Sequence, residues 1–167
     1  MADRLFLRPF AEGDAEGFHE GVFSCMELQE CFGLTGVPAF PDAQRYVHER
    51  AVRAEKKRFY DRVIVRACDG VIVGEINAAF IAPDTADVGY VIGTSFQNRG
   101  YAVCALQQMI SELHDEGIRN VYGACRADNF KSAAVMKHCG MIPASMVPEA
   151  VKEKEESEDL IWFYTAL

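Results

Sequence analysis

The chain has 167 residues, half of them hydrophobic, and eleven are phenylalanine. A disordered chain has a far less apolar composition, and the length fits one domain, so we expect residues 1–167 to form a single domain with one core. The formal net charge of −8 argues against a nucleic-acid partner, because phosphate contacts need a basic face.

The sequence shows no membrane-spanning or secretory segment. No apolar stretch approaches the ~20 residues that cross a bilayer, and the N-terminus lacks the apolar core of a signal peptide. We therefore expect a cytoplasmic protein with no membrane partner and with free thiols rather than disulfides. No C-x-x-C pair is present, so we expect no metal. The cysteines are Cys25, Cys31, Cys68, Cys104, Cys125 and Cys139.

Short strands and helices alternate along the chain, which predicts an α+β (mixed α/β) fold: a twisted, mostly antiparallel sheet of about six to seven strands with about four flanking helices. Residues 4–9 predict the first strand. Asp14 is placed to cap a helix with a mostly apolar face, although Gly17 and Gly21 weaken it. That face carries Ala15, Phe18, Val22 and Cys25.

A Gly- and Pro-rich loop at residues 31–42 follows, and its length makes it a candidate substrate wall. Asp42 is the expected cap of a second helix with a helical apolar period. Residues 58–67 and 71–82 then predict a hairpin around Asp69-Gly70, and a turn at residues 83–85 adds a third antiparallel strand.

The remaining elements follow in the same way. A helix is expected from Ala102, with Val103, Leu106, Met109, Ile110 and Leu113 on one face and Gly117 at its end. Residues 120–125 predict a strand, and either Asp128 or Asn129 opens a further helix that Gly140 ends. An acidic loop precedes an apolar last strand at residues 160–167.

The stretch between the third antiparallel strand and the next helix is polar, with Gln97, Asn98, Arg99 and Gly100 in a row. The first N–H groups of a helix are unpaired and carry partial positive charge, so a phosphate binds there readily. Gly100 allows close approach, and Gln97 and Arg99 add donors. The alternative is a plain strand-to-helix turn with a polar cover. Neither the P-loop motif nor the G-x-G-x-x-G motif is present.

Residues 87–106 and 120–143 resemble the GNAT superfamily of N-acetyltransferases, and in detail its RimJ/RimL-type branch. The likeness rests on "VGY" at residues 88–90, on the Q-x-x-G-x-A loop, and on an N-x-x-S pattern followed by K-x-x-G-M. The residues that carry it are Gln97, Gly100, Ala102, Asn129, Ser132, Lys137, Gly140 and Met141. The opening residues 4–18 are similar to the family's first strand and helix.

The resemblance implies a GNAT-like fold in which a splayed strand pair forms the acyl-CoA cleft, with acetyl-CoA as co-substrate and an amine acceptor, either a peptide N-terminus or a small amine. The loop would take the pyrophosphate, and a backbone N–H of the preceding strand would stabilise the oxyanion. The cofactor-binding residues so implied are Tyr90, Val91, Ile92, Gln97, Asn98, Arg99, Gly100, Tyr101, Ala102, Asn129 and Ser132.

Glu75 is the candidate general base, since a cationic amine must lose a proton before it attacks. By alternation it shares a strand face with Val71, Val73 and Asn77, and burial would raise its pKa. A solvent-facing or arginine-paired carboxylate is the competing interpretation. Asp87 and Glu149 are alternative bases. Some RimL-like members carry a carboxylate near the position that holds Val151 here.

Two further residues depart from the family pattern. Met136 stands where many relatives have the tyrosine that protonates the thiolate, so Ser132 or a water is left as the donor, although Ser132 could simply bind cofactor. Cys104 stands where a glutamate is usual. The alternative is a covalent mechanism with His114 or His138 as base, but a cysteine at core-like spacing in a helix is more often a small buried hydrophobe.

These departures leave an alternative function open, that of a non-catalytic acyl-CoA-binding or regulatory module. They also leave open whether the protein is a monomer or a homodimer that pairs through its last strand. The leading prediction is an N-acetyltransferase that works by direct attack in a ternary complex.

Overall fold

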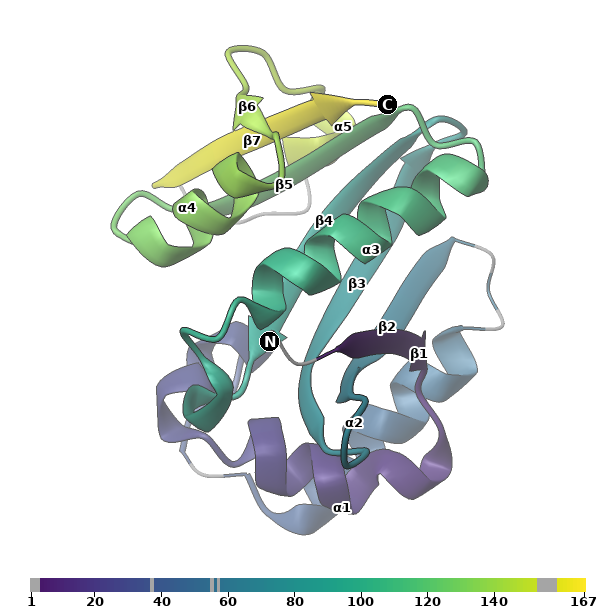
Figure 1. Cartoon of the computed structure of the whole chain (residues 1–167), viewed down its shortest axis with the longest axis vertical. Coiled ribbons are helices and arrows are strands. Elements are labelled where there is room, and N and C mark those ends of the chain that lie inside the picture. Colours follow the sequence, from purple (N-terminus) through teal and green to yellow (C-terminus); the bar gives the residue numbers. More distant parts are fainter. Residues whose placement is uncertain (1–3, 37, 55, 57, 153–158) are drawn as a thin grey trace.

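The computed structural model describes residues 4–36, 38–54, 56, 58–152 and 159–167. These residues form one seven-stranded sheet in the order β1-β2-β3-β4-β5-β7-β6, in which only β4 and β5 pair in parallel. The predicted mixed, mostly antiparallel sheet is confirmed (Figure 1). The strands are β1 (Leu5–Pro9), β2 (Phe59–Arg66), β3 (Ile72–Ala82), β4 (Thr85–Ile92), β5 (Asn120–Arg126), β6 (Ile142–Pro143) and β7 (Leu160–Ala166).

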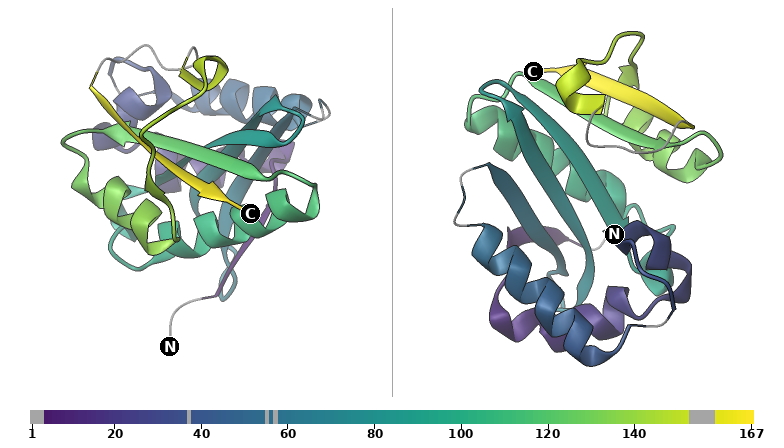
Figure 2. Two further views of the ribbon diagram at one scale, coloured as in Figure 1. Left: turned by 90° about the horizontal axis from the view of Figure 1, so that it is seen from above. Right: turned by 180° about the vertical axis from the view of Figure 1, so that it is seen from behind.

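Helices cover both faces of this sheet. Seen from behind, α2 crosses the face opposite α3 (Figure 2). The α-helices are α1 (Ala15–Phe18), α2 (Phe40–Arg53), α3 (Tyr101–Asp115), α4 (Phe130–His138) and α5 (Glu149–Lys152). Short 3₁₀ segments form η1 (Glu12–Asp14), η3 (Met26–Phe32) and η4 (Thr94–Phe96), and a π-helical turn forms η2 (His19–Phe23).

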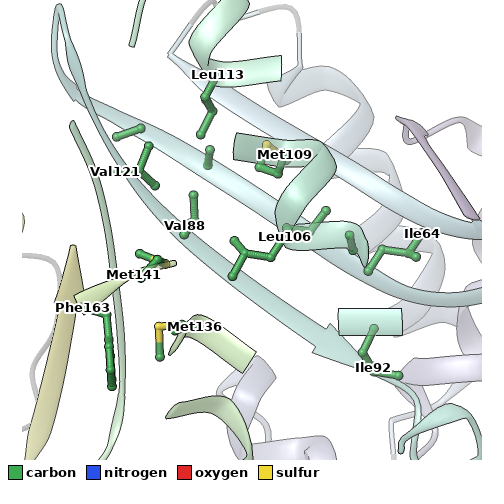
Figure 3. Packing of buried hydrophobic residues seen from close by; sticks show 14 of the residues in the cluster. Ile64, Val88, Ile92, Leu106, Met109, Leu113, Val121, Met136, Met141 and Phe163 are labelled. Carbon is green, nitrogen blue, oxygen red and sulfur yellow. The ribbon is translucent and has the colours of Figure 1, made fainter. Parts of the chain in front are cut away.

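Two apolar clusters lie on the two faces. The first packs α3 and α4 against the sheet, and Leu106, Met109 and Leu113 from α3 meet Val88 and Val121 from the parallel strands (Figure 3). The second packs α1, η2 and α2 on the other face and is rich in phenylalanine. Because both faces are covered, the central strands are apolar on both sides.

The continuous helix expected after Asp14 is wrong. One α-helical turn is followed by the π turn η2, because the chain must lie directly on β3. A Cβ on Gly21 would stand 2.4 Å from the carbonyl oxygen of Ile72, so only glycine allows this approach. Asp14 accepts a hydrogen bond from the Ala11 N–H at 2.8 Å and pairs with Arg8 at 2.6 Å, so it caps the 3₁₀ turn η1.

Two other helix starts differ from expectation by a few residues. Helix α2 begins at Phe40 with Ala39 as its cap residue, and Asp42 accepts from the Ala39 N–H at 3.0 Å from inside the first turn. Helix α3 begins at Tyr101 rather than Ala102. Asn129, not Asp128, caps α4, since its side chain accepts from the Ser132 N–H at 3.1 Å. Most of the acidic loop, residues 153–158, lies outside the described residues.

Candidate active site

The polar stretch before α3 forms an amide-rich turn. Asn98 (φ 61°) and Gly100 (φ 80°) both have left-handed backbone conformations, which turn successive N–H groups toward one side. The first helical hydrogen bond of α3 runs from the Cys104 N–H to the Gly100 carbonyl at 3.1 Å. The N–H groups of Ala102 and Val103 precede it in the first turn, where a helix carries partial positive charge. An anion is stabilised at such a turn.

The parallel strands beside this turn separate. Strand β4 pairs with β5 only from Thr85 to Val88, opposite Asn120 to Gly123. Beyond Gly123, the described part of β5 pairs with β7 alone, while β4 stays on β3 as far as Ile92. The two strands start side by side and diverge toward their C-terminal ends (Figure 1). The edge of β4 that follows Val88 therefore faces an opening.

A cavity of about 400 Å³ joins the turn to this opening. Ten of the eleven predicted cofactor-binding residues line it. They are Tyr90, Val91, Ile92, Gln97, Asn98, Gly100, Tyr101, Ala102, Asn129 and Ser132. Arg99 does not line the cavity, and its guanidinium donates instead to the Ser95 carbonyl at 3.4 Å. The Gln97 amide is likewise tied to the chain, since it donates to the Ile92 carbonyl at 3.2 Å.

Other lining residues were missed from the sequence. Lys131, between the motif residues Asn129 and Ser132, brings its ammonium within 3.5 Å of the Gln97 amide oxygen and adds a positive charge beside the turn. The sequence signal that could have identified Lys131 is its position inside the N-x-x-S motif. Leu28 and Cys31 come from η3 and close the far wall. Cys31 falls within residues 31–42, the loop that was expected to form a wall, whereas nothing in the sequence pointed to Leu28, because η3 begins before that loop.

Tyr90 and Ser132 meet across the opening. Tyr90 lies two residues beyond the last β4–β5 pair, and its hydroxyl is 2.8 Å from the Ser132 Oγ and 3.1 Å from the Ser132 carbonyl oxygen on α4. Burial raises the pKa of Tyr90 to about 12, so the hydroxyl stays protonated at neutral pH. Met136, one helical turn after Ser132, is 1% exposed and packs against Gly123.

Glu75 lies on the other face of the sheet. A register shift between Ile64 and Val65 breaks the alternation in β3, so Val71 and Val73 pack into the α3 cluster while Glu75 faces α2. The predicted shared face was therefore wrong. Strand pairing cannot be read from one strand alone, and the shift arises between β2 and β3.

Glu75 is buried in a network that reaches it from α2. It is 4% exposed, and the Tyr46 hydroxyl donates to its Oε1 at 2.7 Å. Arg50 donates to the Tyr46 hydroxyl and also, at 3.2 Å, to Asp61, which is 1% exposed. Arg53 holds Asp61 through two bonds of 2.8 and 2.6 Å. Glu75 is thus linked to an arginine, as the competing interpretation proposed, but only indirectly, through the hydroxyl of Tyr46.

The surroundings of Glu75 shift its ionisation. Burial raises the pKa of its carboxyl above the ordinary value, and the positive charge of Arg50 and the hydroxyl of Tyr46 oppose this in part. The Tyr46 ring stacks on Phe18 with centroids 5.5 Å apart and meets Phe23 and Phe32 as well. A carboxyl group on this face therefore sits beside an aromatic cluster.

Residues 4–142 match the model of the acetyltransferase (GNAT) domain family. The chain belongs to this family. It is 27% identical over 140 residues to the uncharacterized N-acetyltransferase YnaD of Bacillus subtilis, covering 83% of this chain and 79% of that protein. GNAT membership makes it an acetyl-CoA-dependent acetyltransferase, as the resemblance implied.

Solved structures share the GNAT fold over almost the whole chain. A putative ribosomal-protein-serine acetyltransferase from Vibrio cholerae superposes with a TM-score of 0.81 at 20% identity, covering 100% of this chain and 96% of that one. Mycobacterium smegmatis RimJ, in complex with a CoA-disulfide, gives 0.79 at 20% identity, covering 99% and 83%.

The remaining candidates of this GNAT chain lie away from the cavity. Cys104 does not line it, and the neighbouring Cys139 thiol has its pKa raised to about 11 by burial and by the proximity of Cys104. Glu149 opens the short helix α5, in which Val151 is fully buried. Asp87 lies in the paired part of β4, opposite Ala79 on β3 and Tyr122 on β5.

All six cysteines are free. Among the described residues, no three His, Cys, Asp or Glu side chains gather in a way that could hold a metal ion. None of the described helices has the length and apolarity needed to cross a membrane.

Proposed function

We propose that this GNAT enzyme transfers the acetyl group of acetyl-CoA to a primary amine, a protein N-terminus or a small amine, by direct attack in a ternary complex. The observation that carries the proposal is the single cavity that is lined both by the amide-rich turn and by the opening between β4 and β5. A site that holds a diphosphate at one end and a thioester at the other needs these two features together.

The turn fits a diphosphate. A Cβ on Gly100 would meet no other atom within 4 Å, so the turn leaves open space on this side. Backbone N–H groups and the Lys131 ammonium supply donors and charge there. Residues Tyr90 to Ile92 would lie along the pantetheine arm, and Asn129 and Ser132 would contact the cofactor from α4. When bound, acetyl-CoA supplies the activated acyl group.

The edge of β4 beyond Val88 fits the acyl carbonyl. Its main-chain groups that face away from β3 have no β5 partner within the described residues. A backbone N–H on this edge would donate to the oxyanion that forms when the amine attacks, and such a fixed donor needs no reorganisation during the reaction. Ser132 brings a hydroxyl group to the same region.

Glu75 remains the proposed general base. It does not line the cavity, but its charge acts on the thiol of Cys31, which does. Burial raises the pKa of the Cys31 thiol, and the charges of Glu30 and Glu75 raise it further. A carboxyl whose pKa lies closer to neutral is a better proton acceptor than an ordinary one. Because Glu75 lies behind the lining residues Leu28 and Cys31, it would accept the proton of the amine through a bridging water.

The acceptor is an amine that carries positive charge before it reacts. The net charge of −8 favours such molecules by attraction. A protein acceptor fits the name of the Vibrio cholerae structure, a putative ribosomal-protein-serine acetyltransferase.

The test uses the purified chain with acetyl-CoA and a panel of N-terminal peptides, polyamines and aminoglycosides. We expect one class of amine to release free CoA at a rate that saturates with acetyl-CoA. A non-catalytic binding module would instead show calorimetric binding of CoA with no release for any amine, and that result would overturn the proposal.

A further inference from the structure

The leaving thiolate needs a partner, and α4 does not supply the tyrosine that many relatives have. Met136 occupies that position and is committed to the core, where its sulfur would lie 3.2 Å from a Cβ placed on Gly123. The Met136 side chain therefore cannot donate a hydrogen bond or a proton to the sulfur of CoA. A different hydroxyl in the opening has to be considered.

Tyr90 has the position for this role. Its side chain extends from β4 to α4, packs beside the α3 cluster and lines the cavity just where β4 leaves β5. The thioester has to occupy this opening if the proposed function is correct. We propose that the Tyr90 hydroxyl donates a hydrogen bond to the sulfur of CoA as the carbon–sulfur bond breaks, and that Ser132 acts as a positioning residue for it.

The hydrogen bonds around the pair allow this arrangement. Either oxygen can be the donor across the 2.8 Å between Tyr90 Oη and Ser132 Oγ. When the Ser132 hydroxyl donates to the Tyr90 oxygen, the Tyr90 O–H is free to turn from the Ser132 carbonyl, 3.1 Å away, to the sulfur. A donor that already receives a hydrogen bond polarises more strongly toward an anion.

The proton balance of the step needs no further reactant. The neutral amine forms the carbon–nitrogen bond, the carbon–sulfur bond breaks with its electron pair on sulfur, and the proton released by nitrogen ends on sulfur. Tyr90 stabilises the thiolate until that proton arrives. Its own high pKa, about 12, means that it donates a hydrogen bond and keeps its proton.

The inference rests on the proposed function, so the test includes a readout that needs no turnover. Ultraviolet absorbance of the thiolate reports how the thiol of bound CoA titrates. In Tyr90→Phe we expect the bound thiolate fraction at a fixed pH below its pKa to fall about tenfold, because a hydrogen bond to a charged group is lost. The affinity for CoA should stay within about twofold, since pyrophosphate contacts dominate it.

Turnover measurements then distinguish the roles of the Tyr90 and Ser132 hydroxyls. With the best amine from the panel, we expect kcat of Tyr90→Phe to fall about 10²-fold with KM for acetyl-CoA unchanged, and Ser132→Ala to lose less. Tyr122→Phe is the matched control, because Tyr122 lies on the neighbouring strand and does not line the cavity. It should behave as the unchanged protein does.

Several results would overturn the inference. An unaltered thiol titration in Tyr90→Phe would show that its hydroxyl does not reach the sulfur. A larger loss of kcat in Ser132→Ala than in Tyr90→Phe would make Ser132 the direct donor. If no amine is acetylated, the proposed function fails, yet the thiol titration still decides whether Tyr90 contacts the sulfur. Absence of CoA binding would refute both.

Discussion

The two faces of the sheet carry different kinds of site, and each is built from different parts of the chain. On the α3 side, ten of the seventeen residues that line the cavity come from one segment, residues 90–103, whose turn presents main-chain N–H groups, and Lys131 is the one charged residue among the seventeen. On the α2 side, Glu75 of β3 belongs to a network whose other side chains come from two separate elements, α2 and β2. The first surface depends on local backbone conformation, and the second depends on long-range contacts.

This difference has an energetic consequence. Backbone N–H groups at a helix start are available because the helix itself leaves them unpaired, so the site costs little to maintain. A buried carboxylate beside arginines must offset its desolvation through good geometry, and losing one partner leaves an uncompensated charge. Stability should therefore be more sensitive to change on the α2 side, and cofactor affinity to change on the α3 side.

The largest effect is expected when Asp61 loses its charge. Asp61→Asn leaves the half-buried Arg50 and Arg53 without their shared partner, which should lower the free energy of unfolding by about 3–5 kcal/mol. Urea denaturation measures this. Asp42→Asn, in an exposed pair with Arg45, is the control and should cost less than about 1 kcal/mol. Equal losses in both variants would contradict a buried network.

Removal of the Glu75 charge should show most clearly in activity. Glu75→Gln keeps an oxygen that can accept from the Tyr46 hydroxyl, but it cannot take a proton, so we expect kcat/KM to fall about 10²-fold. Glu12→Gln, in an exposed pair with His48, should leave the rate unchanged. A fully active Glu75→Gln would transfer the role of base to another group.

The same variant should change how stability depends on pH. The pKa of Glu75 is higher in the folded chain than in the unfolded one, so the folded state binds more protons between the two values. The free energy of unfolding therefore has a contribution that is full below the unfolded pKa and is lost as pH rises through the folded pKa. Urea denaturation of Glu75→Gln across this range should lack that loss.

The sequence predicted the α3 side far better than the α2 side, for a physical reason. Left-handed turns, helix starts and strand ends are set by neighbours in the chain, so Gly100, Asn129 and the strand before them could be placed from local pattern. The seven-stranded sheet followed from the same signals. Of the predicted cofactor-binding residues, Arg99 does not line the cavity, because its flexible side chain turns to the Ser95 carbonyl.

What could not be predicted depends on contacts between distant segments. The face of Glu75 was set by a bulge between β2 and β3, and its partners Tyr46 and Arg50 come from a helix whose sequence shows only an apolar face. The prediction of a continuous N-terminal helix was wrong for a similar reason, because Gly21 lies close to the main chain of Ile72 on β3. The Tyr90–Ser132 contact joins residues 42 positions apart.

The smallest effect on stability, and the sharpest test of the α3 side, comes from two glycines. Gly100 and Gly140 have φ values of 80° and 83°, and a Cβ on either would meet nothing within 4 Å. Replacement of either by alanine should therefore cost a similar roughly 1–2 kcal/mol, from left-handed backbone strain alone. Only Gly100→Ala places a methyl group where a diphosphate would approach the turn, so it alone should weaken CoA binding, by roughly tenfold in calorimetry. If both variants bind CoA equally well, the diphosphate does not rest on this turn, and the contrast between a backbone-built face and a side-chain-built face loses its functional meaning.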